Sequence, residues 1–186
     1  MVQRWMAIVP LPVLVLACAH GTVSGPAQPA PTLGAFVPTP PETIERMLEL
    51  AEVTADDVVY DLGSGDGRIV ILAAKRYGAR GVGVEIDPTL VWFSIRNARR
   101  EHVDHLVTFL HQDALTIDVS PATVVTLYLS PQANRRLRPI LQTQLRPGAR
   151  VVSHAHDMGD WEPERVEYVV SRRGERQALY LWRISK

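Results

Sequence analysis

The chain has 186 residues, 46% hydrophobic and 22% charged, so it can bury the core of one domain and is not a disordered polyelectrolyte. Its 20 basic and 20 acidic side chains give a net charge of +0, which argues against nucleic-acid binding because phosphate affinity needs surplus Lys and Arg. The single cysteine, Cys18, excludes an internal disulfide and a cysteine-based zinc site.

The first 20 residues have the pattern of a signal peptide. A lone arginine precedes the apolar stretch Ala7–Ala17, and small residues follow it. Val15–Cys18 is similar to a bacterial lipobox, in which the cysteine is lipidated. We therefore expect a membrane-associated lipoprotein anchored at Cys18. An uncleaved anchor and a misassigned start codon, the latter giving a cytoplasmic protein, are the alternatives. Residues 21–35 are rich in proline and predict a linker without chemistry.

Residues 36–186 alternate strand and helix patterns, which predict one α/β domain with a parallel sheet covered by helices on both faces. Strands are expected at 58–62, 81–85, 107–110, 124–129 and 150–154, with helices starting near 40, 69, 88 and 131. Two further β-rich runs, 166–171 and 178–183, flank Gly174 and predict an antiparallel hairpin at the edge of the sheet.

Three positions predict helix boundaries. Thr39 is expected to cap the first helix, with Glu42 at the reciprocal position of a capping box. Asp87, which precedes a proline, is expected to cap the third helix. Pro139 is expected to kink or break the fourth helix, because proline has no backbone N–H to donate.

Acidic residues follow the first three expected strands: Asp61, Glu85 and Asp113. Ligands of open α/β sheets bind beyond the carboxyl ends of strands, so these carboxylates are expected to share one site. The glycine-rich segment Gly63–Gly67 has the spacing G-x-G-x-G, whereas dinucleotide folds use G-x-G-x-x-G. Acidic groups repel a pyrophosphate and suit a phosphate-free cation such as S-adenosylmethionine (SAM). A nicotinamide-dependent oxidoreductase is therefore disfavoured.

Two strand ends predict particular contacts. Glu85 lies 85 − 63 = 22 residues after Gly63, near the ~20-residue offset at which an acidic side chain reaches ribose hydroxyls. Asp113 is expected to accept from the adenine amino group, and Ala114 to offer a backbone N–H to the ring. The alternative for Asp113 is a turn residue.

Simpler interpretations compete for the acids around the glycines. Asp61 could cap a helix or pair with Arg68, and Asp66 could cap the helix that follows it.

The segment Tyr60–Arg68 resembles motif I of class I SAM-dependent methyltransferases, and Gly83–Asp87 resembles their acidic second-strand motif. Phe36–Pro40, Thr126–Leu129 and Arg150–His154 are similar to bacterial relatives of the mitochondrial lysine methyltransferases that modify the ATP synthase c-subunit and the adenine nucleotide translocase. The resemblance implies a seven-stranded Rossmann-like sheet, SAM across the ends of the first three strands, and residues 36–40 lying over the cofactor.

Motifs and resemblance together give the expected site. The cofactor-binding residues are Pro38, Thr39, Asp61, Gly63, Ser64, Gly65, Asp66, Glu85, Ile86, Asp113, Ala114 and Tyr128. Tyr128 and Ser130 are the expected catalytic, acceptor-side residues, with an ordinary strand residue as the alternative for Tyr128. No metal is expected, although His154, His156 and Asp157 form a short cluster in the sequence.

The residues therefore predict a SAM-dependent methyltransferase. The family resemblance implies a protein-lysine acceptor and a protein substrate, by analogy a membrane protein. Two other functions stay open. One is a small-molecule methyltransferase, since the chain is short and has little insertion after the fourth strand. The other is a non-catalytic exported binding module that keeps the fold.

Overall fold

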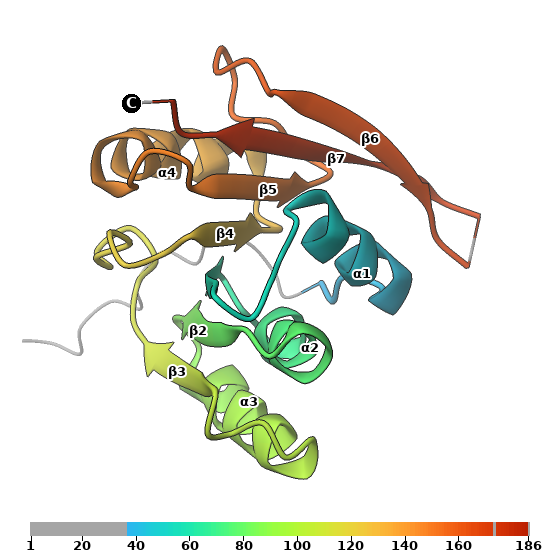
Figure 1. The fold of residues 1–186 in the computed structure, drawn as a ribbon, viewed down its shortest axis with the longest axis vertical. Helices are drawn as coiled ribbons and strands as arrows, with labels where there is room; N and C mark the ends of the chain where they lie inside the picture. Colours follow the sequence, from blue (N-terminus) through green and yellow to red (C-terminus); the bar gives the residue numbers. More distant parts are fainter. Residues whose placement is uncertain (1–36, 173, 186) are drawn as a thin grey trace, which may run out of the picture.

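The computed structural model describes residues 37–172 and 174–185, which contain one seven-stranded sheet with strand order β3-β2-β1-β4-β5-β7-β6 (Figure 1). The strands are β1 Val58–Leu62, β2 Arg80–Glu85, β3 Val107–His111, β4 Val124–Leu127, β5 Arg150–His154, β6 Arg165–Val170 and β7 Arg176–Arg183. The helices are α1 Pro41–Leu50, α2 Arg68–Tyr77, α3 Pro88–Arg100 and α4 Pro131–Gln144. The expected α/β class and seven-stranded sheet are confirmed.

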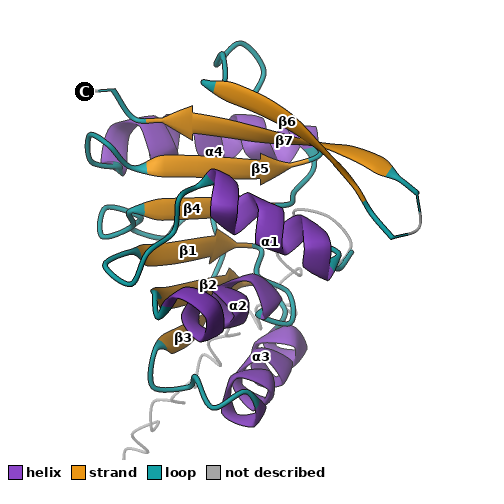
Figure 2. Ribbon diagram, turned by 45° about the vertical axis from the view of Figure 1, so that its right-hand side comes forward, coloured by secondary structure: helices purple, strands orange, loops and turns teal. Residues whose placement is uncertain are grey.

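The sheet is buried between two helical layers (Figure 2). Val59 and Val124 point to the layer of α1 and α2, whereas their neighbours Tyr60 and Val125 point to α4. Side chains alternate between the faces of a strand, and both faces of the central strands β1, β4 and β5 are buried, so these strands are largely apolar runs. This is the physical reason why the strand positions were predictable.

The strand order places a crevice at the centre of the sheet. β1 pairs in parallel with β2 on one side and with β4 on the other, so the chain winds in opposite directions from this point. Loops leaving β1 and β4 diverge at such a switch point and leave room for a ligand at the carboxyl ends of the strands.

The C-terminal hairpin is confirmed, with β7 antiparallel to both β5 and β6. Strand β7 begins at Arg176, two residues earlier than expected, and His154 at the end of β5 is paired with Leu179. The start of β7 therefore extends past the carboxyl end of β5, on the side of the sheet where β1 and β4 also end (Figure 2).

The capping-box prediction for α1 is wrong, and of the two outcomes expected at Pro139 the break does not occur, while the kink stays a prediction. Helix α1 has Pro40 at its N-cap position with no side-chain cap, because Thr39 lies one residue too early and Glu42 accepts a hydrogen bond from the Arg172 backbone at 2.7 Å. Helix α4 is one helix through Pro139 and does not break there. The prediction for α3 is confirmed, since Asp87 accepts from the backbone N–H of Thr89 at 2.7 Å.

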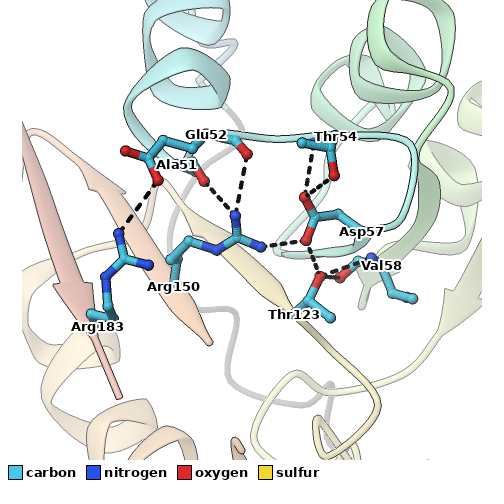
Figure 3. Close-up of polar contacts among 8 residues, drawn as sticks. All are labelled: Ala51, Glu52, Thr54, Asp57, Val58, Thr123, Arg150 and Arg183. Carbon is cyan, nitrogen blue, oxygen red and sulfur yellow. Dashed lines mark hydrogen bonds and ion pairs between the residues drawn. The ribbon is translucent and has the colours of Figure 1, made fainter. Parts of the chain in front are cut away.

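A buried ion pair joins the end of α1 to the amino ends of the strands (Figure 3). Arg150 pairs with Asp57 and donates to the carbonyl oxygen of Ala51 at 2.9 Å. Asp57 also accepts from the hydroxyl of Thr123 at 2.6 Å and the backbone of Thr54 at 2.8 Å. Burial by itself raises the pKa of Asp57, but these hydrogen bonds and the charge of Arg150 lower it overall.

The predictions for residues 1–20 and 21–35 lie outside the described residues. Among the residues that the structure does describe, no helix combines the length and the apolar character needed to cross a membrane.

Candidate active site

A cavity of about 340 Å³ opens at the carboxyl ends of β1, β2 and β4. It is lined by Val37, Pro38, Thr39, Asp61, Gly63, Ser64, Asp66, Arg68, Ile69, Val84, Glu85, Ile86, Asp87, Leu90, Gln112, Asp113, Ala114, Tyr128, Leu129 and Ser130. The structure thus brings together all the expected site residues except Gly65. The backbone N–H of Gly65 instead donates to the carboxylate of Glu85 at 2.9 Å, so Gly65 helps to fix the position of Glu85.

Asp61 is a buried carboxyl group that accepts a hydrogen bond from the hydroxyl of Thr126 at 2.8 Å. Burial, opposed by that hydrogen bond and reinforced by the negative charges of Glu85 and Asp66, raises the pKa of Asp61 to about 7. Arg68 pairs with Asp66 and not with Asp61, so the ion pair considered for Asp61 does not form. A cation entering the cavity would favour the ionised form of Asp61.

Glu85 is fixed by the backbone at the end of β2. Its Oε1 accepts from the N–H groups of Ile86 at 2.8 Å and Asp87 at 3.0 Å, while its Oε2 accepts from Gly65 at 2.9 Å. A carboxylate has about four lone-pair positions, so one remains on Oε2. The side chain is therefore oriented in advance and can accept one further hydrogen bond.

Asp66 lines the cavity, but its carboxylate is engaged by Arg68 in a bidentate pair at 2.8 and 2.6 Å. The same guanidinium donates to the carbonyl oxygen of Thr39 at 3.0 Å. Helix α2 has Gly67 at its N-cap position, so Asp66 is not the N-cap residue, although its Oδ1 also accepts from the backbone N–H of Arg68 at 3.4 Å. Asp66 and Arg68 together tie residues 37–39, which we call the strap, to the start of α2.

The turn after β1 requires glycine at its first position. Gly63 has φ +80°, and a Cβ atom there would lie 2.7 Å from Cδ2 of Leu129 on the neighbouring loop. The hydroxyl of Ser64, the next residue, is buried in the cavity wall without a hydrogen-bond partner among the described residues. The turn therefore presents backbone and one free hydroxyl to the cavity at close range.

We expect Gly63→Ala to destabilise the protein by about 2–4 kcal/mol, because it combines left-handed strain with a steric clash. Gly148→Ala is the matched control: it has φ +84° and no atom within 4 Å of the added Cβ, so only strain applies. Urea unfolding of both variants measures the difference. Equal losses would show that Leu129 moves aside without cost.

Tyr128 and Ser130 follow β4 and line the cavity, as do the residues of the strap. The hydroxyl of Ser130 accepts from the backbone N–H of Ala133 at 3.3 Å and so caps α4. The ring of Tyr128 lies against the ring of His154, with centroids 4.0 Å apart. Both hydroxyl groups therefore belong to side chains held by the fold.

Asp113 and Ala114 lie in the cavity wall after β3. Asp113 accepts from the backbone N–H of Leu115 at 2.9 Å, which makes it a turn residue as well as a lining residue. His154, at the end of β5, is fully buried, and burial lowers its pKa to about 4. Among the described residues, no group of three or more His, Cys, Asp or Glu side chains could hold a metal ion.

Several lining residues were not expected from the sequence. They are Val37, Arg68, Ile69, Val84, Asp87, Leu90, Gln112 and Leu129. Arg68 and Asp87 belong to the two recognised motifs, so the motifs themselves carried a signal for them. Val37 belongs to the segment 36–40 that the resemblance implied to lie over the cofactor. Leu90 and Gln112 carry no residue-type signal, since apolar and amide side chains of this kind occur throughout the chain.

Known proteins with similar sequences include several methyltransferases. A family model described as the ANTKMT methyltransferase domain matches residues 61–165. A protein-lysine N-methyltransferase of Saccharolobus islandicus is 42% identical over 132 residues, which are 70% of this chain and 82% of that protein. A lysine N-methyltransferase of the ATP synthase c-subunit, from Xenopus laevis, is 36% identical over 131 residues; the match covers 70% of this chain and 57% of the Xenopus protein.

One of the similar solved structures resembles this chain both in sequence and in fold. A Salinibacter ruber protein, described as an RNA methyltransferase in complex with S-adenosyl-L-homocysteine, is 54% identical to this chain with a TM-score of 0.77. The match covers 81% of this chain and 95% of the Salinibacter protein.

The fold and the acid-lined cavity define a SAM-dependent methyltransferase, with SAM as its cofactor. The chain belongs to the ANTKMT methyltransferase family, which confirms the resemblance identified from its motifs.

Proposed function

We propose that this methyltransferase transfers a methyl group from SAM to the side-chain amine of a protein lysine. The observation that carries the proposal is the charge of the cavity. Among its lining residues are five carboxylates, Asp61, Asp66, Glu85, Asp87 and Asp113, and one cationic group, Arg68, which Asp66 already pairs. A rim of this sign attracts a lysine ammonium and repels phosphate.

The cavity fits the chemical groups of the cofactor. The buried carboxyl of Asp61 gains a partner if it faces the methionine ammonium, and the unpartnered hydroxyl of Ser64 can bond to the methionine carboxylate. The remaining lone pair of Glu85 can accept from a ribose hydroxyl. Ile86, Leu90 and Ala114 provide an apolar slot for adenine.

Bound SAM supplies a methyl carbon activated by its sulfonium. The protein then has to align the acceptor and exclude water, which makes orientation the main contribution. A lysine ammonium must first release to water the proton that it keeps up to a pKa of about 10.4, and the neutral amine then takes the methyl group while S-adenosylhomocysteine leaves. Burial of the amine against the cavity residues Tyr128 and Thr39 would favour the neutral form. In this proposal the hydroxyls of Tyr128 and Ser130 hold the neutral amine, which is supported by the position of both residues in the cavity lining.

The relatives support a protein acceptor, since the Saccharolobus and Xenopus proteins are named as lysine methyltransferases. The Salinibacter protein is described as acting on RNA, which makes RNA the second candidate. The acidic lining favours lysine over RNA, because an RNA acceptor brings phosphates to the rim.

Radiolabelled SAM incubated with the purified protein and with soluble and membrane fractions of the source cells tests the proposal. We expect a labelled band that is destroyed by protease and yields methyl-lysine after acid hydrolysis. Label that is removed by ribonuclease would contradict lysine and favour RNA, and labelled metabolites would favour a small-molecule enzyme. The Asp61→Asn variant, which lacks the carboxylate proposed to bind the cofactor, serves as the unlabelled control.

We also propose that the protein is anchored to a membrane through a lipid on Cys18, with a membrane protein as its substrate. The pattern of residues 15–18 supports this proposal. Mass spectrometry of the amino terminus in the source cells tests it: we expect a chain that begins with a lipidated cysteine, and an intact Met1 would contradict the anchor.

A further inference from the structure

His154 is a fully buried histidine that does not line the cavity but stands directly behind its wall. It is the last residue of β5, and its side chain contacts three segments that are distant in the sequence. Two of these segments, the strap and the loop after β4, line the cavity themselves. The third is the start of β7, which extends past the end of β5.

Each contact uses a different part of the imidazole ring. Nδ1 lies 3.4 Å from the hydroxyl of Thr39 in the strap, and Nε2 is hydrogen-bonded to the side-chain oxygen of Gln177 on β7. The face of the ring packs against Tyr128 at 4.0 Å between centroids, with the planes 36° apart. The ring therefore connects the strap, the loop after β4 and the hairpin.

One protonation state satisfies both nitrogens. The neutral form with its proton on Nε2 donates to Gln177 and accepts at Nδ1 from the Thr39 hydroxyl. Burial keeps the imidazole neutral, since its pKa is lowered to about 4. With both nitrogens engaged and no exposed surface, His154 does not serve as a base for an acceptor in the cavity.

We propose that His154 is a positioning residue for methyl transfer, which holds the strap over the cofactor and Tyr128 at the acceptor side, and which is itself held by Gln177 of the hairpin. The proposal rests on methyl transfer and on the proposed place of Tyr128 beside the acceptor. It does not depend on the acceptor being lysine.

Gln177 lies outside the cavity, but its hydrogen bond to His154 gives it an indirect effect on the strap and on Tyr128. The strap is fastened at Thr39 by two links, the Arg68 guanidinium on its carbonyl oxygen and the His154 ring near its hydroxyl. Without Gln177 the Nε2–H group of His154 is buried with no acceptor, which costs free energy. A rotation of the ring or a move of the proton to Nδ1 lowers that cost. Either change alters the contacts of Nδ1 with the strap and of the ring face with Tyr128.

Substitution of Gln177 tests the proposal without touching a lining residue. We expect Gln177→Leu to raise the dissociation rate of SAM about fivefold to tenfold, measured by stopped-flow displacement with S-adenosylhomocysteine. We expect the single-turnover rate of methyl transfer to fall by a similar factor, using the acceptor that the labelling experiment identifies, whether protein or RNA.

Gln177→Glu keeps an acceptor oxygen at the same position and is expected to restore both rates to within about twofold of the wild type. Gln142→Leu, in α4, is the matched control for the loss of an amide. His154→Phe keeps a ring against Tyr128 and removes both nitrogens, so it should resemble Gln177→Leu in the dissociation rate.

If His154 only stabilises the fold, Gln177→Leu will have a lower melting temperature but the same two rates as Gln142→Leu. That result would overturn the proposal. Nitrogen NMR of the His154 ring adds a direct readout: we expect a proton on Nε2 in the wild type and a loss of that single tautomer in Gln177→Leu. A wild-type ring protonated on Nδ1 would also overturn it. If the acceptor proves to be RNA, the lysine proposal fails. The dissociation rate of SAM and the tautomer of the His154 ring still decide the proposal for His154.

Discussion

The Asp61→Asn variant is expected to bind SAM about 10- to 150-fold more weakly than the wild type, because it removes the carboxylate that we propose as the charged partner of the ligand ammonium. Asparagine has the same shape, and its Oδ1 can still accept from the hydroxyl of Thr126. Titration calorimetry with SAM measures the change. Asp56→Asn, at an exposed position outside the cavity lining, is the control and should bind SAM normally.

The same substitution should change how stability depends on pH. Asp61 has a pKa near 3.8 in the unfolded chain and about 7 in the folded one, so the folded state holds an extra proton between these values. The contribution of Asp61 to the stability of the wild type therefore falls as the pH rises from about 4 to about 7, by roughly 4 kcal/mol in total, and it is constant above pH 7. The variant has no such loss.

Urea unfolding at several pH values from about 4.5 to about 8 measures this difference between the variant and the wild type. We expect the difference to move in favour of the variant by a few kcal/mol over that range. The affinity of the wild type for SAM should rise with pH up to about 7 and then level off, since binding needs ionised Asp61. A flat difference would mean that Asp61 is already ionised without its ligand.

The second large effect concerns the ion pair between Asp57 and Arg150. We expect Arg150→Met to destabilise the protein by about 3–5 kcal/mol, because it leaves the Asp57 carboxylate buried without its charged partner and removes a donor from the carbonyl of Ala51 (Figure 3). Thermal and urea unfolding measure the loss. SAM affinity of the folded variant should be unchanged, because neither residue lines the cavity.

The neighbouring Arg183 provides the matched control, since its guanidinium lies 3.6 Å from Glu52 at the surface, and Arg183→Met should cost less than about 1 kcal/mol. The pH dependence adds a second check. Asp57 has a lowered pKa, so its contribution is present above its unfolded value near 3.8 and is lost as the pH falls through its folded value. Equal costs for the two arginine substitutions would contradict a special role for Arg150.

The fold was predictable because the chemistry that forms it is local. Strands covered on both faces are continuous apolar runs, as in Val58–Leu62, and the glycines that follow β1 are needed at its turn. The clustering of Asp61, Glu85 and Asp113 also followed from the sequence, because parallel strands end at one edge of the sheet.

The partners of these side chains were not predictable, because they depend on distances across the fold. The sequence left open whether Arg68 pairs with Asp61 or elsewhere, and only the direction of the chain after Gly67 places it on Asp66. The capping box at Glu42 failed for the same reason, since Arg172, 130 positions away, takes its carboxylate. His154 and Thr39 are 115 positions apart, and no pattern along the chain relates them.

The two ends of the described chain lie on opposite sides of the sheet. Val37, where the described chain begins, lines the cavity at the carboxyl ends of the strands. The other end of the described chain is on the opposite side, where Ile184 exchanges backbone hydrogen bonds with the turn before β5. An affinity tag or a fluorophore attached after the last strand therefore starts on the side of the sheet away from the cavity.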